Sequence, residues 1–191
     1  MTNLPQRLIF DGAFGTYYTS LYGSHEICEL ANIHHPERVQ RIHKEYVDAG
    51  AQAIKTNTFS IMKLKEECDL DTWQNIIYTA VKHAKAIAKD KVFVFADLGP
   101  LEEQQDKTAY IEVLDIFLKA GLTHFLFETL NSAKGLKEAC DYIKHQCPEA
   151  KIILSFAVNV DGYTRKGYGL RTLFNHLDTI SYDVIGLNCM N

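Results

Sequence analysis

The sequence predicts an α/β fold of the (β/α)8 TIM-barrel type, and this chain supplies about the first six β/α units of it. Two observations lead to this prediction. Short apolar segments alternate with segments of helical period along all 191 residues, and almost every apolar segment ends on polar residues. In a (β/α)8 barrel the functional groups lie at the carboxyl ends of the strands, so polar endings on successive strands are typical of that architecture.

Six apolar segments are the predicted strands. Each is short and apolar on both faces, as expected of parallel strands that are covered on both sides. They are residues 8–10, 53–56, 92–96, 125–127, 152–157 and 184–187.

Amphipathic helices are predicted between these strands. A stripe at Val39, Ile42 and Tyr46 steps by three or four residues, so one face of that helix is expected to be buried. Gly50 and Gly121 each follow an alanine at the end of a helical segment, where glycine commonly terminates a helix. The pattern continues without a linker, which indicates one domain over residues 1–191, incomplete at its C-terminus.

The polar endings favour the barrel over an open doubly wound sheet, which six strands with intervening helices also fit. A complete barrel typically needs about 250 residues, so this chain corresponds to the first three quarters of one. The endings are DGAFGT (11–16), KTNTF (55–59), ADLGP (96–100), FETLN (127–131), SFAVN (155–159) and LNC (187–189).

The composition argues against several classes of partner. The formal net charge is -4, and the lysines are scattered among glutamates, so no basic face for nucleic acid is expected. The N-terminus lacks the cationic start and apolar run of a signal peptide, and no 18 consecutive residues are apolar, so we expect a cytoplasmic protein without membrane contact. Five cysteines at irregular spacing predict reduced thiols rather than a disulfide framework.

Five motifs stand in a characteristic order: DGAFGT, the segment 29–59 from EL to NTF, ADLGP, FETL and GLNC. In this order they resemble the homocysteine S-methyltransferase family, which includes the homocysteine-binding barrels of methionine synthases and betaine-homocysteine methyltransferases. The segment 29–59 is the most specific of the five, whereas Asp-Gly in DGAFGT is by itself typical of a turn. The resemblance covers essentially the whole chain. It implies an enzyme that transfers a methyl group to the thiol of homocysteine and gives methionine.

The resemblance also implies a zinc cofactor. Members of the family bind zinc through three cysteine thiolates, one at the end of strand six and an adjacent pair at the end of strand eight, and Cys189 matches the first. A free thiol has a pKa of about 8.5 and is mostly protonated at neutral pH, whereas zinc holds a coordinated thiol as the thiolate. From the residues alone, a packed core thiol is the commoner role of a free cysteine, and the resemblance favours the metal.

The same resemblance implies substrate-binding roles for five residues. Asp11 and Glu128 match acidic residues that hold the amino group of homocysteine. Thr56 and Phe59 match positions that line the amino-acid pocket, and Asn188 stands beside the ligand cysteine, where it orients that cysteine or the substrate. The residues that select the methyl donor are expected outside this chain, so methyl-cobalamin, methyltetrahydrofolate, S-methylmethionine and betaine all stay open.

One departure from the family pattern concerns the adjacent cysteine pair, because the 191 residues contain no Cys-Cys. We therefore expect a fragment that ends before strands seven and eight, with the two companion ligands of Cys189 beyond Asn191. Such a chain is expected to be inactive by itself. Its unclosed edges, at strands one and six, should favour self-association.

Two alternatives stay open. Another barrel enzyme, such as an aldolase, would need a Schiff-base lysine, and Lys55 at the mouth of strand two is the candidate for that role. A non-catalytic domain would keep the homocysteine pocket without zinc.

Overall fold

The computed structural model describes residues 4–23 and 27–189, with the side chain of Cys189 outside that description. Within these ranges one parallel sheet contains β1 (Ala53–Lys55), β2 (Phe93–Leu98), β3 (His124–Leu130), β4 (Lys151–Val158) and β5 (Val184–Cys189). The order of the strands in the sheet is their order in the sequence. A doubly wound sheet reverses its strand order at a switch point. The sequential order therefore identifies the singly wound arrangement of a barrel and confirms the predicted fold class.

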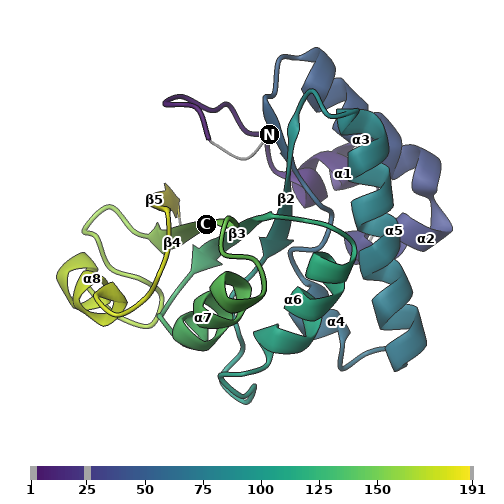
Figure 1. Ribbon diagram of the computed structural model, residues 1–191. Coiled ribbons are helices and arrows are strands. Elements are labelled where there is room, and N and C mark those ends of the chain that lie inside the picture. Colours follow the sequence, from purple (N-terminus) through teal and green to yellow (C-terminus); the bar gives the residue numbers. More distant parts are fainter. Residues whose placement is uncertain (1–3, 24–26, 190–191) are drawn as a thin grey trace.

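Helices connect the strands and cover the outer face of the sheet, as Figure 1 shows for α6 and α7. They are α1 (Phe14–Tyr22), η1 (Cys28–Leu30), α2 (Ala31–His34), α3 (Pro36–Asp48), α4 (Ile61–Leu64), α5 (Leu70–Ala88), α6 (Tyr110–Lys119), α7 (Leu136–Gln146) and α8 (Leu170–Leu177). α5 begins after Asp69, whose carboxylate accepts a hydrogen bond from the N–H of Thr72 at 2.9 Å. Gly50 and Gly121 follow α3 and α6 with positive φ, as predicted. None of the described helices is long and apolar enough to cross a membrane.

The prediction of a strand at residues 8–10 is wrong. Phe10 forms a single parallel bridge to Ala53, and the N–H of Asp11 donates to the carbonyl of Ala53 at 2.9 Å. This segment pairs with β1, which is itself three residues long, and Ile9 is 62% exposed. The length of β1 is not the cause, because β1 pairs along all three of its residues with β2. The bridge still places Asp11 beside the carboxyl end of β1.

The two faces of the sheet carry two different apolar clusters. The outer face packs against the helices in one large core that includes Phe125, Phe127 and Trp73. The inner face, which lines the barrel interior, carries a smaller cluster built around Ala53, Phe95 and Leu126, against which Phe93 and Ile153 pack. Successive side chains of a strand point to opposite faces, so residues two positions beyond the inner cluster also face the barrel interior.

Candidate active site

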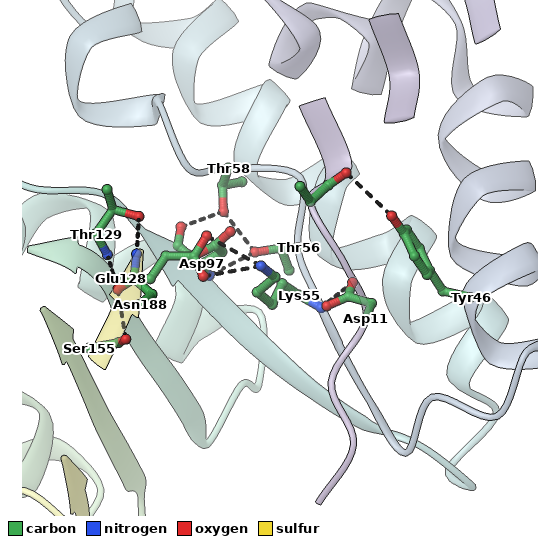
Figure 2. Close-up of polar contacts among 11 residues, drawn as sticks. Asp11, Tyr46, Lys55, Thr56, Thr58, Asp97, Glu128, Thr129, Ser155 and Asn188 are labelled. Atoms are coloured by element: carbon green, nitrogen blue, oxygen red, sulfur yellow. Dashed lines mark hydrogen bonds and ion pairs between the residues drawn. The ribbon is translucent and has the colours of Figure 1, made fainter. Parts of the chain in front are cut away.

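A polar layer lies directly above the apolar inner cluster. Two residues beyond Ala53, Phe95 and Leu126 along their strands come Lys55, Asp97 and Glu128. Because these strands are parallel and adjacent, their carboxyl ends bring the three side chains together. Figure 2 shows Lys55 lying between Asp11 on one side and Glu128 and Asp97 on the other.

Lys55 and Glu128 form the central ion pair of this layer. The Lys55 Nζ lies 3.2 Å from Oε1 and 3.1 Å from Oε2 of Glu128, and the two side chains are 11% and 24% exposed. Burial lowers the pKa of Lys55, but the carboxylates of Asp97, Glu128 and Asp11 together raise it above its ordinary value. A Schiff-base lysine needs a lowered pKa to be nucleophilic. The paired, protonated Lys55 therefore does not suit the aldolase alternative.

Asp11 reaches this layer from the segment before α1. Its Oδ2 accepts a hydrogen bond from the backbone N–H of Lys55 at 3.0 Å, whereas its Oδ1 is buried without a partner. Burial raises the pKa of Asp11 from 3.8 to about 7, although the charge of Lys55 acts in the opposite direction. Burial thus favours the neutral carboxyl group, and a second cation close to Oδ1 would favour its ionised form.

Thr56 and Thr58 fix the backbone of Asp97 through a directed chain of hydrogen bonds. The Thr58 Oγ1 donates to the carbonyl of Asp97 at 2.8 Å, so in its 2.7 Å contact with Thr56 it accepts. The Thr56 Oγ1 in turn accepts from the N–H of Asp97 at 3.1 Å. Both threonine hydroxyls thereby commit their protons to joining the ends of β1 and β2.

The backbone of Asp97 has hydrogen-bond partners, but one oxygen of its carboxylate has none. Asp97 is 4% exposed, and its Oδ1 is buried without a hydrogen-bond partner. Burial raises the pKa of Asp97 well above its ordinary value, and the neighbouring charge of Glu128 raises it further. An unpaired buried carboxylate is costly, so this oxygen is a position where a cation would be stabilised.

Asn188 connects β5 to the end of β3. Its Oδ1 accepts from the Ser155 Oγ at 2.8 Å and from the N–H of Thr129 at 3.3 Å, and its Nδ2 donates to the Thr129 Oγ1 at 3.2 Å. Thr129 has a φ of 57°, which is strained for a β-branched residue. Asn188 therefore stabilises the strained residue that directly follows Glu128.

Two adjoining cavities open onto the polar layer. The larger has a volume of about 680 Å³, and its lining includes Asp11, Phe59 and Asn188. The smaller, of about 340 Å³, includes Thr56 and Asp97 in its lining. Lys55, Phe59, Glu128 and Thr129 line both. The volume of the larger cavity falls within the range of about 300–1,000 Å³ that is typical of small-molecule sites.

The structure brings Asp11, Thr56, Phe59, Glu128 and Asn188 together around these cavities. Thr56 is buried and its hydroxyl is engaged with Asp97 and Thr58, whereas Phe59 is 36% exposed at the mouth. Sequence reasoning did not single out Asp97, and it did not predict the pairing of Lys55 with Glu128. The signal was present, because Lys55, Asp97 and Glu128 each follow an inner-face residue at the strand period of two.

The metal prediction concerns Cys189. Its backbone ends β5 beside Val158, but its side chain lies outside the described part of the structure. Among the side chains that are described, no group of three histidine, cysteine, aspartate or glutamate residues is placed to hold a metal ion. Those described side chains do not by themselves make a zinc site.

Together these features define a barrel protein with a cluster of carboxyl groups around one lysine at the carboxyl ends of its strands. A model of the homocysteine S-methyltransferase family matches residues 8–191, and the chain belongs to this family.

Two relatives and one solved structure place the chain within the family. It is 25% identical over 215 residues to methionine synthase of Mycobacterium tuberculosis and 24% identical over 221 residues to that of Mycobacterium leprae, and covers 18% of each. The chain thus spans about a fifth of the length of these relatives. The metallated form of the homocysteine methyltransferase MmuM from Escherichia coli superimposes with a TM-score of 0.79 at 18% identity, over 97% of this chain and 75% of MmuM. This likeness shows a shared fold.

Proposed function

We propose that the protein transfers a methyl group to the thiol of homocysteine and so produces methionine. The observation that carries the proposal is the group of carboxyl side chains around Lys55, at the strand ends of a chain that belongs to the homocysteine S-methyltransferase family. Three carboxylates, Asp11, Asp97 and Glu128, surround the single ammonium group of Lys55. Burial raises the pKa values of Asp11 and Asp97, and a ligand that brings a second ammonium group, as an amino acid does, would favour their ionised forms.

In this proposal Asp11 and Glu128 bind the amino group of homocysteine. Asp11 has a buried, unpaired oxygen for that role, and Glu128 lines both cavities. Phe59 borders the pocket at its exposed mouth, and Thr56 fixes the pocket wall through Asp97. Asn188 holds the backbone after Glu128 in place, so it acts on the substrate through the shape of the pocket.

We further propose that the active protein depends on zinc, with Cys189 as one thiolate ligand and its two companions outside these 191 residues. When bound there, zinc would keep the thiol of homocysteine deprotonated at neutral pH. A serine hydroxyl is a much poorer ligand for this ion than a thiolate. In the protein that carries all the ligands, Cys189→Ser should therefore lose most of its zinc, measured by elemental analysis, while circular dichroism stays unchanged. Stoichiometric zinc in that variant would mean that Cys189 is a core thiol.

We also propose that the protein acts in the cytoplasm.

Binding of homocysteine to Glu128→Gln tests the substrate assignment. Removing this carboxylate should weaken binding by about 2 kcal/mol or more, because a buried ammonium loses its charged partner. Isothermal titration calorimetry measures the loss. Glu102→Gln is the matched control, since Glu102 lines the larger cavity from an exposed position and its loss should change binding little. Equal affinities of parent and Glu128→Gln would contradict the assignment.

Methyl transfer is tested with each of four donors in turn: methyl-cobalamin, methyltetrahydrofolate, S-methylmethionine and betaine. Methionine formed with at least one of them supports the proposed reaction. Tight homocysteine binding without methionine formation from any donor would instead favour a non-catalytic homocysteine-binding domain.

A further inference from the structure

The pairing of Lys55 with Glu128 creates a conflict with the proposed substrate site. Both oxygens of Glu128 already accept from the Lys55 ammonium. A substrate ammonium that binds Glu128 must therefore compete with this lysine. If Lys55 lost Glu128 without finding another partner, its charge would stay buried and unpaired, which costs several kcal/mol.

Asp97 offers Lys55 a second partner. Its carboxylate is the strongest of the three that attract the Lys55 charge, although the ion pair that the structure records for Lys55 is with Glu128. The Asp97 Oδ1 has no hydrogen-bond partner and is shielded from solvent, so it is available to a buried cation. The long side chain of lysine can move a point charge over a short distance.

We propose that Asp97 is a positioning residue for the substrate: it receives the Lys55 ammonium when the amino group of the substrate takes Glu128. The bound site then holds two ammonium groups and the carboxylates of Asp11, Asp97 and Glu128. The Oδ2 of Asp11 continues to accept the hydrogen bond from the backbone N–H of Lys55, and its buried Oδ1, which has no partner, would become one for the substrate ammonium. This inference rests on the proposed homocysteine site. It adds the residue that keeps the displaced Lys55 ammonium paired with a carboxylate.

The exchange predicts that Asp97 affects the binding only of ligands that carry an ammonium group. A ligand without an ammonium group, such as 4-mercaptobutanoate, leaves Lys55 on Glu128 and has no need of Asp97. Asp97→Asn keeps the size of the side chain and the backbone hydrogen bonds to Thr56 and Thr58. Asp97→Asn should therefore lower the affinity for homocysteine by at least about tenfold. Its affinity for 4-mercaptobutanoate should stay within twofold of that of the parent.

A double-mutant cycle with Lys55→Gln distinguishes positioning from direct contact. When residue 55 carries no charge, no lysine needs a second partner, and Asp97→Asn should then change homocysteine binding by less than about twofold. All four proteins are titrated with both ligands by calorimetry, with thermal unfolding as the check on folding. If a Lys55→Gln protein fails to fold, the ratio of the two ligand affinities in Asp97→Asn alone decides the question.

Three results would overturn the inference, and they are distinguishable. Asp97→Asn that binds homocysteine like the parent, or that weakens both ligands equally, excludes the exchange and leaves the proposed function standing. If Asp97→Asn still lowers the affinity for homocysteine in a protein that also carries Lys55→Gln, Asp97 contacts the ligand directly. A parent protein that binds no homocysteine removes the proposed function and the exchange together.

Discussion

Replacing Lys55 by methionine tests whether this one ammonium group stabilises the buried carboxylates of the site. Its side chain is 11% exposed, and its ion-pair partner Glu128 is 24% exposed. Breaking a buried pair by removing one partner costs about 3–5 kcal/mol. The partial exposure of Glu128 places the expected loss of unfolding free energy near the lower end, at about 3 kcal/mol at pH 8.

The loss should depend on pH in a definite direction. The pKa values of Asp11 and Asp97 are already raised in the folded protein, and without Lys55 they should rise further. A raised carboxyl pKa means that the folded state binds more protons than the unfolded state, so stability falls as pH rises from about 4 through the folded pKa. Lys55→Met should therefore be more costly at pH 8 than at pH 5.5.

Urea unfolding of parent and variant at these two pH values measures the effect. Lys137→Met is the matched control, because Lys137 pairs with Asp141 on the surface, where the two side chains are 53% and 51% exposed. Such an exposed pair contributes about 0–1 kcal/mol. If Lys55→Met costs no more than Lys137→Met, and costs the same at both pH values, Lys55 does not offset buried negative charge.

Three other changes test separate features. Asp11→Asn should stabilise the protein by about 2–4 kcal/mol at pH 8 and by much less at pH 4, because the Asp11 pKa is raised from 3.8 to about 7; urea unfolding that shows no gain at pH 8 would refute this. Gly99→Ala should destabilise by about 1–3 kcal/mol, since its Cβ would lie 2.7 Å from the carbonyl oxygen of Phe59, whereas at Gly186 the nearest atom is 3.9 Å away; thermal unfolding of both alanine variants compares them, and equal melting temperatures would count against the argument. The 191-residue chain should self-associate through the edge of β5, where Val184 and Leu187 are 42% and 51% exposed; sedimentation velocity should show association that Leu187→Lys reduces, and a monomer at every concentration would exclude it.

The strands were predictable because burial on both faces of a parallel sheet requires short runs of consecutive apolar residues, which are visible in the sequence. β2 to β5 lie within about three residues of the predicted ranges, and β1 ends one residue earlier than predicted. The segment at 8–10 was not predictable as a bridge, because three apolar letters in a row suit a short strand equally well and its one pairing partner, Ala53, is distant in the sequence.

The site was predictable in part. The rule that barrel chemistry lies at strand ends drew attention to the endings that contain Asp11 and Glu128, and the family resemblance singled out these two residues. The structure places both at the mouth. The ion pair between Lys55 and Glu128 joins residues 73 positions apart, so it depends on strand pairing that no local pattern records. The free oxygen of Asp97 depends on the hydrogen bonds that its neighbours make elsewhere. The role of Cys189 stays a prediction.

The sequential order of the strands has a consequence for synthesis on the ribosome. Each strand from β2 onward pairs with the strand that immediately precedes it in the chain, so the sheet can grow from its N-terminal side while translation continues. The binding pocket cannot be completed as early, because Asn188 of β5 supplies the hydrogen bonds that hold Thr129 beside Glu128. A nascent chain released before residue 188 would carry most of the sheet but would lack the hydrogen bonds that support the backbone next to Glu128.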